Sequence, residues 1–98
     1  MKKSIADIVE YAKNFSNFNE LLVSNNKTRI SADAKRMVCT WLYEYTRYTY
    51  KDMGVELGFS TPSTAFYHIE RHSLRMKESE GYRRDFADFK LHMNKLLR

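Results

Sequence analysis

Apolar residues recur along the whole chain at the three- and four-residue spacings of amphipathic helices. The first such segment starts at Ser4, which forms a capping-box-like pattern with Asp7, and it ends in the asparagine-rich stretch 14–19. The next residues, 20–23, predict one short helical turn, and the polar residues 24–30 predict a loop. The positions that the first helix should bury are Ile5, Ile8, Val9, Ala12 and Phe15.

A longer amphipathic segment covers about residues 31–46 and predicts the central helix of the core. Ser31 can cap this helix, and Asp33 falls in its expected first turn, where the helix dipole favours a carboxylate. Its apolar stripe consists of Ala34, Met37, Val38, Trp41, Leu42 and Tyr45. Because Trp41 belongs to this stripe, we expect it in the core rather than stacked on a base. We expect Cys39, next to the stripe, to be partly buried and unreactive.

Strong capping signals divide the second half of the chain. Thr49 and Asp52 form a second capping box, and Gly58 is a natural helix stop. The dipeptide Thr61-Pro62 then supplies an N-cap and a proline at the first helical position. The long helix that follows is expected to bury Ala65, Phe66, Ile69 and Met76.

This long helix should run to Gly81, which is expected to break it, and a last helix should cover about 82–97. The face that the last helix buries is predicted to consist of Phe86, Phe89, Met93, Leu96 and Leu97. No segment predicts a strand, because the alternating tyrosines of 43–50 lie within a stronger helical pattern. The expected fold class is all-α, a compact single domain of five to six helices over residues 1–98.

Length and composition restrict the function classes. A chain of 98 residues is too short to form two cores, and it has no apolar run of about 18 residues that would span a membrane. Asp7 and Glu10 interrupt the apolar stretch that a signal peptide needs. The single cysteine allows no internal disulfide and no paired thiolates for zinc, so we expect a reducing, cytoplasmic location. The net charge of +5 favours polyanionic partners.

Residues 49–72 contain the pattern with the most functional content: a short helix, a glycine-bearing turn and a well-capped second helix. A helix-turn-helix has this order, here over about 49–78, and its second helix enters the major groove of DNA N-terminus first. The side chains that would face the groove are Ser60, Thr61, Ser63, Thr64, Tyr67 and Arg71. An ordinary helical hairpin has the same capping pattern, so the pattern alone leaves both interpretations open.

Three stretches of the sequence fall in an order and spacing that a known family shares. They are the basic loop Lys27-Thr28-Arg29, the helix AKRMVCTWLYEYT over 34–46, and YKDMGVELGFSTPSTA over 50–65. From about residue 5 to at least residue 75, the chain resembles the C-terminal DNA-binding domain of the bacterial replication initiator DnaA, a fold related to the Trp repressor. The resemblance implies a helix-turn-helix of that type and binding to double-stranded DNA.

The resemblance also implies particular DNA contacts. Lys27 and Arg29 would reach into the minor groove, and Lys35 would contact the backbone. Residues 60–64 would form the start of the recognition helix in the major groove. Two more cations should dock on phosphates, Arg36 and Lys51.

The departures from the family motif restrict what the chain can recognise. Where the family has GGRDHTT, this chain has GFSTPST over 58–64, so the second glycine, the arginine, the aspartate and the histidine are all missing. Each good base contact contributes about 1–3 kcal/mol of discrimination, so this chain should not recognise the initiator's own site. It also lacks the GxxxxGK[ST] motif, so we expect it to bind no nucleotide and not to be an initiator.

The sequence therefore predicts a DNA-binding protein without enzymatic activity, a small regulator or replication accessory factor of bacterial or phage origin. No base, nucleophile and oxyanion donor fall together in one segment. His68 and His72 have an i, i+4 spacing that could hold a metal, but no third ligand is evident, so we expect no metal and no cofactor. We expect His68 at the surface or in a second layer beneath it, and His72 near the inward face.

The alternative is a protein-interaction module that kept the fold and lost base readout. It rests on the missing base-reading residues, the modest net charge, and three tyrosines at or beyond the edge of the apolar stripe. These are Tyr43, Tyr48 and Tyr50. An exposed tyrosine suits a phosphate oxygen and a protein partner equally well.

Overall fold

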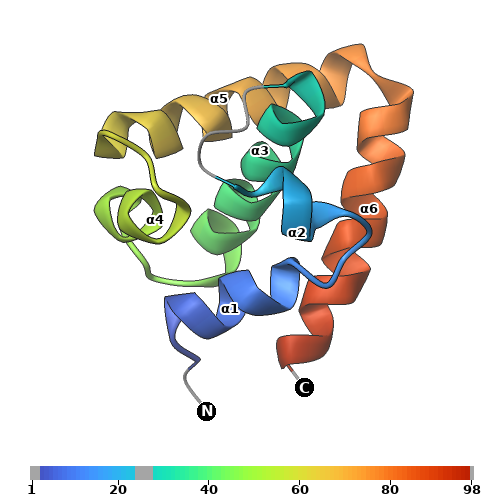
Figure 1. Cartoon of the computed structure of the whole chain (residues 1–98). Helices are drawn as coiled ribbons and strands as arrows, with labels where there is room; N and C mark the ends of the chain where they lie inside the picture. Colours follow the sequence, from blue (N-terminus) through green and yellow to red (C-terminus); the bar gives the residue numbers. More distant parts are fainter. Residues whose placement is uncertain (1–2, 24–27, 98) are drawn as a thin grey trace.

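The computed structural model describes residues 3–23 and 28–97, which form six α-helices and a 3-10 turn, with no strand among them (Figure 1). The all-α prediction is confirmed. The elements are α1 (Ile5–Ala12), α2 (Phe18–Leu21), α3 (Arg29–Tyr45), α4 (Tyr50–Leu57), α5 (Pro62–Glu78), α6 (Glu80–Asn94) and the 3-10 turn η1 (Lys95–Leu97). Across the described ranges, no helix has both the length and the apolar character needed to cross a bilayer.

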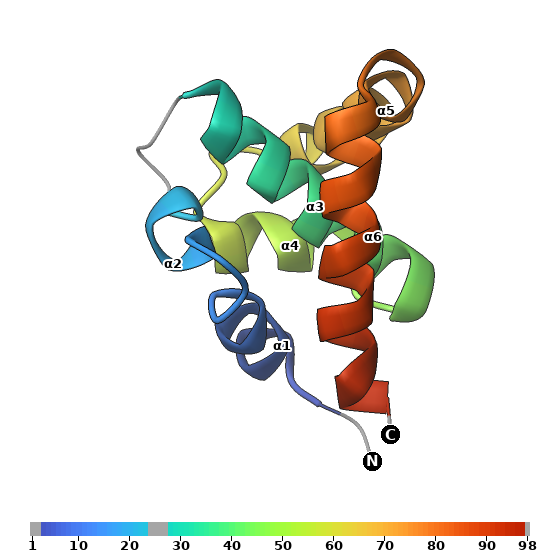
Figure 2. The same ribbon diagram turned by 90° about the vertical axis from the view of Figure 1, so that its right-hand side faces the viewer.

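The long helix α3 forms the centre of the molecule. In Figure 1, α5 crosses α3 near the top of the view and α6 runs down from the end of α5, so that its far end lies beside α1. Figure 2 shows the same arrangement from the side of α6. The residues of α3 that are buried come from nearly its whole circumference: Ser31, Ala34, Lys35, Met37, Val38, Cys39, Thr40, Trp41 and Leu42.

The predicted core position of Trp41 is confirmed. Its side chain is buried, and the indole N–H donates to Asn94 Oδ1 of α6 at 3.1 Å. Cys39 is fully buried, beyond the partial burial that the sequence predicted, and burial raises the pKa of its thiol to about 12. The thiol therefore stays protonated at neutral pH, which removes it as a nucleophile.

Several predicted helix boundaries are confirmed by individual hydrogen bonds. Ser4 Oγ accepts the backbone N–H of Asp7 at 3.1 Å at the start of α1. Thr49 and Asp52 form both bonds of the capping box of α4, at 2.9 and 3.1 Å. Gly58 ends α4 with a left-handed φ of 75°, the conformation in which glycine has no Cβ clash.

The start of α3 differs from the prediction. Thr28 caps the helix by accepting the backbone N–H of Ser31 at 3.1 Å, so α3 begins two residues earlier than expected. Ser31 is buried instead, and its hydroxyl donates to the carbonyl of Leu21 at 2.5 Å. Asp33 consequently lies beyond the first turn, where it forms an ion pair with Arg75 of α5 at 2.9 Å rather than meeting the helix dipole.

The boundary between α5 and α6 lies at Ser79 and not at Gly81 as predicted. Ser79 Oγ accepts the backbone N–H of Tyr82 at 3.1 Å and caps α6, while Gly81 lies inside the first turn of that helix. The reason is that a serine cap satisfies a free N–H at the helix start, whereas glycine stops a helix only where the backbone takes a positive φ.

Some side chains predicted to be inward are exposed. The exposed fraction is 44% for Phe66, 38% for Tyr45 and 57% for Leu97. Phe66 and Tyr45 lie at the edges of the buried faces of their helices. Leu97 follows the end of α6 and belongs to η1, so it leaves the α6 face.

Replacing Gly58 by alanine should lower the free energy of unfolding by about 1 kcal/mol, because an L-residue is strained at a positive φ. The control is Gly81→Ala, where an added Cβ would meet only Ser79 Oγ at 3.8 Å; this change should stabilise the protein by about 0.5 kcal/mol. Urea unfolding followed by circular dichroism measures both. Equal effects at the two glycines would contradict the left-handed turn.

Candidate nucleic-acid interface

The start of α5 is held against α4 by a close backbone approach. The chain turns through residues 58–61, and the backbone N–H of Phe59 donates to the carbonyl of Gly54 at 2.8 Å. A Cβ on Gly54 would lie 3.7 Å from the carbonyl oxygen of Thr61 and 3.9 Å from Cα of Pro62. The site has room for a methyl group and not for a larger side chain, so the two helices are fixed relative to each other there.

The tip formed by residues 60–64 is largely exposed and rich in hydroxyl groups. Ser60, Thr61 and Ser63 are exposed, and Thr64 is half-buried. The Thr61 hydroxyl lies 2.9 Å from that of Ser63 and 3.4 Å from that of Thr64. Thr61 is the N-cap of α5, but its side chain accepts no hydrogen bond from the first turn. The partial positive charge of the helix start therefore faces outward.

Four other predicted contact residues are exposed outside this tip. Tyr67 and Arg71 are exposed one and two turns further along α5, and the Arg71 guanidinium lies 5.8 Å from the centre of the Tyr67 ring. Lys51 is exposed in the first turn of α4, and Arg29 is exposed at the start of α3. In Figure 1, the starts of α3 and α5 both lie in the half of the molecule opposite α1, but on different sides of the view: α3 begins beside the later part of α5, where Asp33 pairs with Arg75 at 2.9 Å. Lys27 lies outside the described residues.

Lys35 and Arg36 do not belong to this exposed surface, contrary to the expectation that they dock on phosphates. Lys35 is only 6% exposed. The Arg36 side chain is 12% exposed and lies 2.5 Å from Asp33, which also binds Arg75. The reason is that neighbouring helices cover α3 on its polar side as well as on its apolar stripe, so cations placed outside the stripe are still covered.

His68 is buried beneath Phe59, which excludes the surface position and leaves the second-layer position of the two that the sequence predicted. Its ring packs against Phe59 at 5.2 Å, and among the described residues its Nδ1 has no hydrogen-bond partner. Burial, reinforced by the positive charges of Arg36 and Lys35, lowers the pKa of His68 to about 4. The ring is therefore neutral at pH 7.

His72 is buried as expected, with its Nδ1 2.6 Å from the hydroxyl of Tyr82. Burial, with a smaller effect from the charge of Lys90, lowers the pKa of His72 to about 4 as well. Within the described part of the chain, no three His, Cys, Asp or Glu side chains come together to hold a metal ion. The two histidines thus belong to the packing between helices.

The structure brings Tyr43 and Tyr50, which the sequence predicted at or beyond the edge of the apolar stripe, together with Phe66, which the sequence predicted to be buried. In this aromatic cluster Tyr43 and Phe66 are exposed and Tyr50 is half-buried. The rings of Tyr43 and Tyr50 are nearly parallel, with centres 6.1 Å apart, and Phe66 lies 5.7 Å from Tyr50. Tyr43 is 55% exposed. Tyr48 does not join the cluster, because its hydroxyl donates to the carbonyl of Lys3 at 2.6 Å. The position of Phe66, at the edge of the apolar face of α5, was the available signal for its exposure.

Comparisons of the chain with protein-family models, with curated proteins and with solved structures find no match.

The two buried histidines predict a loss of stability in mild acid. The unfolded chain takes up protons near the ordinary pKa of 6.5, but the folded chain takes them up only near pH 4. The contribution of the two histidines to the free energy of unfolding is therefore fully present above pH 6.5 and decreases as the pH falls from 6.5 through 4. For the pair, the free energy of unfolding should decrease by about 2–4 kcal/mol between pH 7 and pH 5. Urea unfolding at several pH values measures this slope.

In the variant His68→Phe, which keeps a ring against Phe59, the pH slope should fall to about half because one titrating group is gone. A slope that stays unchanged in this variant would show that His68 does not contribute to the acid sensitivity.

Proposed function

We propose that the chain binds double-stranded DNA and carries out no chemistry on it. The observation that carries this proposal is the start of α5, an exposed helix end with hydroxyl side chains and no side-chain cap. At this helix start Pro62 has no N–H and the N–H of Thr64 donates to the carbonyl of Thr61 at 3.2 Å, so the helix dipole and the exposed hydroxyl groups, more than free N–H groups, would face a phosphate. Short hydroxyl side chains also allow the helix to approach base edges closely. The α4–turn–α5 order is the one that a helix-turn-helix uses to insert its second helix into the major groove.

Three exposed cations around this helix support the proposal. Arg71 lies on α5, Lys51 lies at the start of α4, and Arg29 lies at the start of α3. None of the three forms an ion pair with another described residue, so their charges are available to phosphates. In the proposed complex, Arg71 and Lys51 flank the major groove, while Arg29, with Lys27 two residues before it in the sequence, reaches toward the minor groove.

The composition of the tip indicates what kind of recognition to expect. The family that the sequence resembles carries an arginine, an aspartate and a histidine at this helix start, and here those positions hold Ser60, Thr61 and Pro62. Hydroxyl groups read bases with little discrimination, because they donate and accept alike. We therefore propose sequence-influenced binding in which phosphate contacts supply most of the affinity, in a role such as a small regulator or replication accessory factor.

Binding to a mixed-sequence duplex should weaken with salt, with a slope of log affinity against log salt of about −3 to −4, as expected for four phosphate contacts. Lys51→Glu should weaken binding and reduce the slope by about one unit or more, because it removes one contact and adds repulsion. Fluorescence anisotropy with a labelled duplex measures both quantities.

The matched control is Arg84→Glu, which reverses an exposed charge on α6 that is weakly paired with Glu80 at 3.7 Å; α6 lies across the molecule from the start of α5 (Figure 1). This variant makes the same change in net charge and should have a much smaller effect. A slope near zero, or equal losses in the two variants, would rule out the proposed DNA surface.

The aromatic cluster supports a second candidate function, a protein-interaction module. Exposed tyrosine and phenylalanine side chains are enriched at protein interfaces, and Tyr43, Tyr50 and Phe66 present three rings together. If this function holds, a stoichiometric partner should co-elute with the protein in size-exclusion chromatography. Phe66→Ser should abolish that co-elution, whereas Lys51→Glu and the control Leu91→Ser, at a residue 69% exposed on α6, should retain it.

A further inference from the structure

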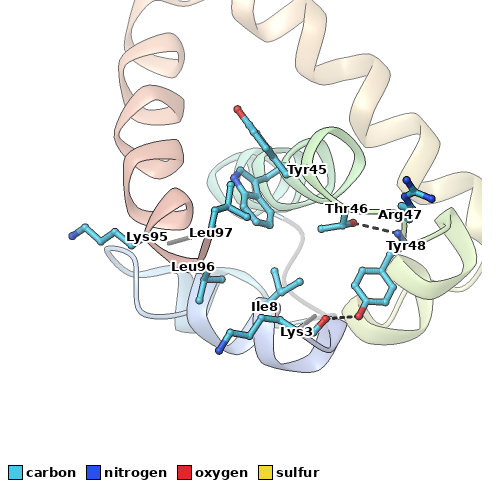
Figure 3. Close-up of a pocket in the computed structure, with 10 residues that line it drawn as sticks. Lys3, Ile8, Tyr45, Thr46, Arg47, Tyr48, Lys95, Leu96 and Leu97 are labelled. Carbon is cyan, nitrogen blue, oxygen red and sulfur yellow. Dashed lines mark hydrogen bonds between the residues drawn. The ribbon is translucent and has the colours of Figure 1, made fainter. Parts of the chain in front are cut away.

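A cavity of about 610 Å³ opens between the start of α1, the end of α3 and the C-terminal end of α6 (Figure 3). This volume lies within the range of about 300–1,000 Å³ that is usual for small-molecule sites. The apolar and aromatic side chains that line the cavity are Ile8, Trp41, Tyr45, Tyr48, Leu96 and Leu97. None of the DNA-contact residues proposed above is part of this lining, so the cavity is a separate feature of the fold.

The walls of this cavity are held in place by hydrogen bonds within the protein. The Tyr48 hydroxyl donates to the carbonyl of Lys3 at 2.6 Å and so ties the segment before α1 to the segment after α3. Thr46 Oγ1 donates to the carbonyl of Leu42 at 2.5 Å and accepts the backbone N–H of Tyr48 at 3.2 Å. The dashed lines in Figure 3 mark two of these bonds. A ligand would therefore find the site largely formed, which lowers the entropic cost of binding.

The charged part of the lining has a single sign. Among the described residues, Lys3, Arg47 and Lys95 line the cavity and no carboxylate does. None of these cations forms an ion pair with another described side chain. Figure 3 shows Lys95 and Arg47 on opposite sides of the cavity, extending away from its centre, while Ile8 and Leu96 lie closer to the middle. The interior is thus apolar and the surroundings of the opening are positive.

We propose that this cavity binds a small amphiphilic carboxylate. The apolar body of the ligand would lie between Ile8 and Leu96 and against the ring of Trp41, where its burial supplies the affinity. The carboxylate would remain at the opening, where lysine and arginine side chains can swing toward it and form charge-assisted hydrogen bonds. A neutral ligand of the same shape gains the apolar contacts but not the electrostatic attraction.

Trp41 makes the test direct, because it is the only tryptophan of the chain and its indole N–H gives a single NMR signal. The probes are octanoate and its neutral amide, octanamide, which share the same apolar body. Octanoate should shift the Trp41 signal in a saturable way, and octanamide should bind about tenfold more weakly. No shift with octanoate, or equal affinity for the two probes, would overturn the proposal.

Variants at the opening and inside the cavity separate the two parts of the proposal. The double variant Arg47→Glu/Lys95→Glu changes exposed side chains only, and it should reduce octanoate affinity about tenfold while leaving octanamide nearly unchanged. Leu96→Arg should abolish binding of both probes, whereas Leu91→Arg, at an exposed residue of α6 outside the cavity, should not. Equal octanoate affinity in the charge-reversed and original proteins would overturn the assignment of an anionic ligand.

The outcome is independent of DNA binding. The same octanoate titration can be repeated on the Lys51→Glu variant, which should bind octanoate normally even where its DNA affinity is lost. Loss of octanoate binding in that variant would contradict a separate carboxylate site.

Discussion

The burial of the middle of α3, residues 31–42, on nearly every side is the constraint on which the rest of the structure depends. A helix that is covered on almost every side needs partners for its polar groups, because an unpaired buried group costs about 1–3 kcal/mol. Among the described residues, Thr40 Oγ1 and Arg36 Nε have no hydrogen-bond partner, whereas three other polar groups of α3 do find partners. Each partner comes from a different element. The Ser31 hydroxyl bonds to α2, the Trp41 indole bonds to α6, and the Asp33 carboxylate pairs with Arg75 of α5. These contacts position the surrounding helices as much as the apolar core does.

The same burial determines which charges remain available at the surface. Lys35 and Arg36 lie within the packing of α3, where their positive charge helps to keep the neighbouring His68 neutral. The cations that face solvent near α5 come instead from helix ends and from α5 itself. A sequence pattern places a side chain on a helix, but the surroundings of that position in the fold decide whether the side chain can reach a ligand.

Different surfaces of one small domain carry different chemistry. The start of α5 combines hydroxyl groups with nearby cations, and the flank that holds Phe66 is aromatic. At the opposite end, the ends of α3 and α6 enclose an apolar cavity with positive surroundings. The proposals for DNA, for a protein partner and for a carboxylate therefore concern separate groups of residues, and a change in one group can leave the others intact.

The sequence by itself determined the helices and most of their caps, because helical periodicity and capping are local properties. The Thr49–Asp52 capping box, the Gly58 stop and the core position of Trp41 all follow from neighbouring residues. Thr28 and Ser31 are both competent caps for α3, and Ser31 is unavailable because its hydroxyl donates to a carbonyl ten residues away, so the cap falls to Thr28. The burial of Lys35 and His68, the exposure of Phe66 and the cavity beside Trp41 depend on which helices pack against each other. Only the tertiary structure decides these features, because they arise from contacts between segments far apart in the chain.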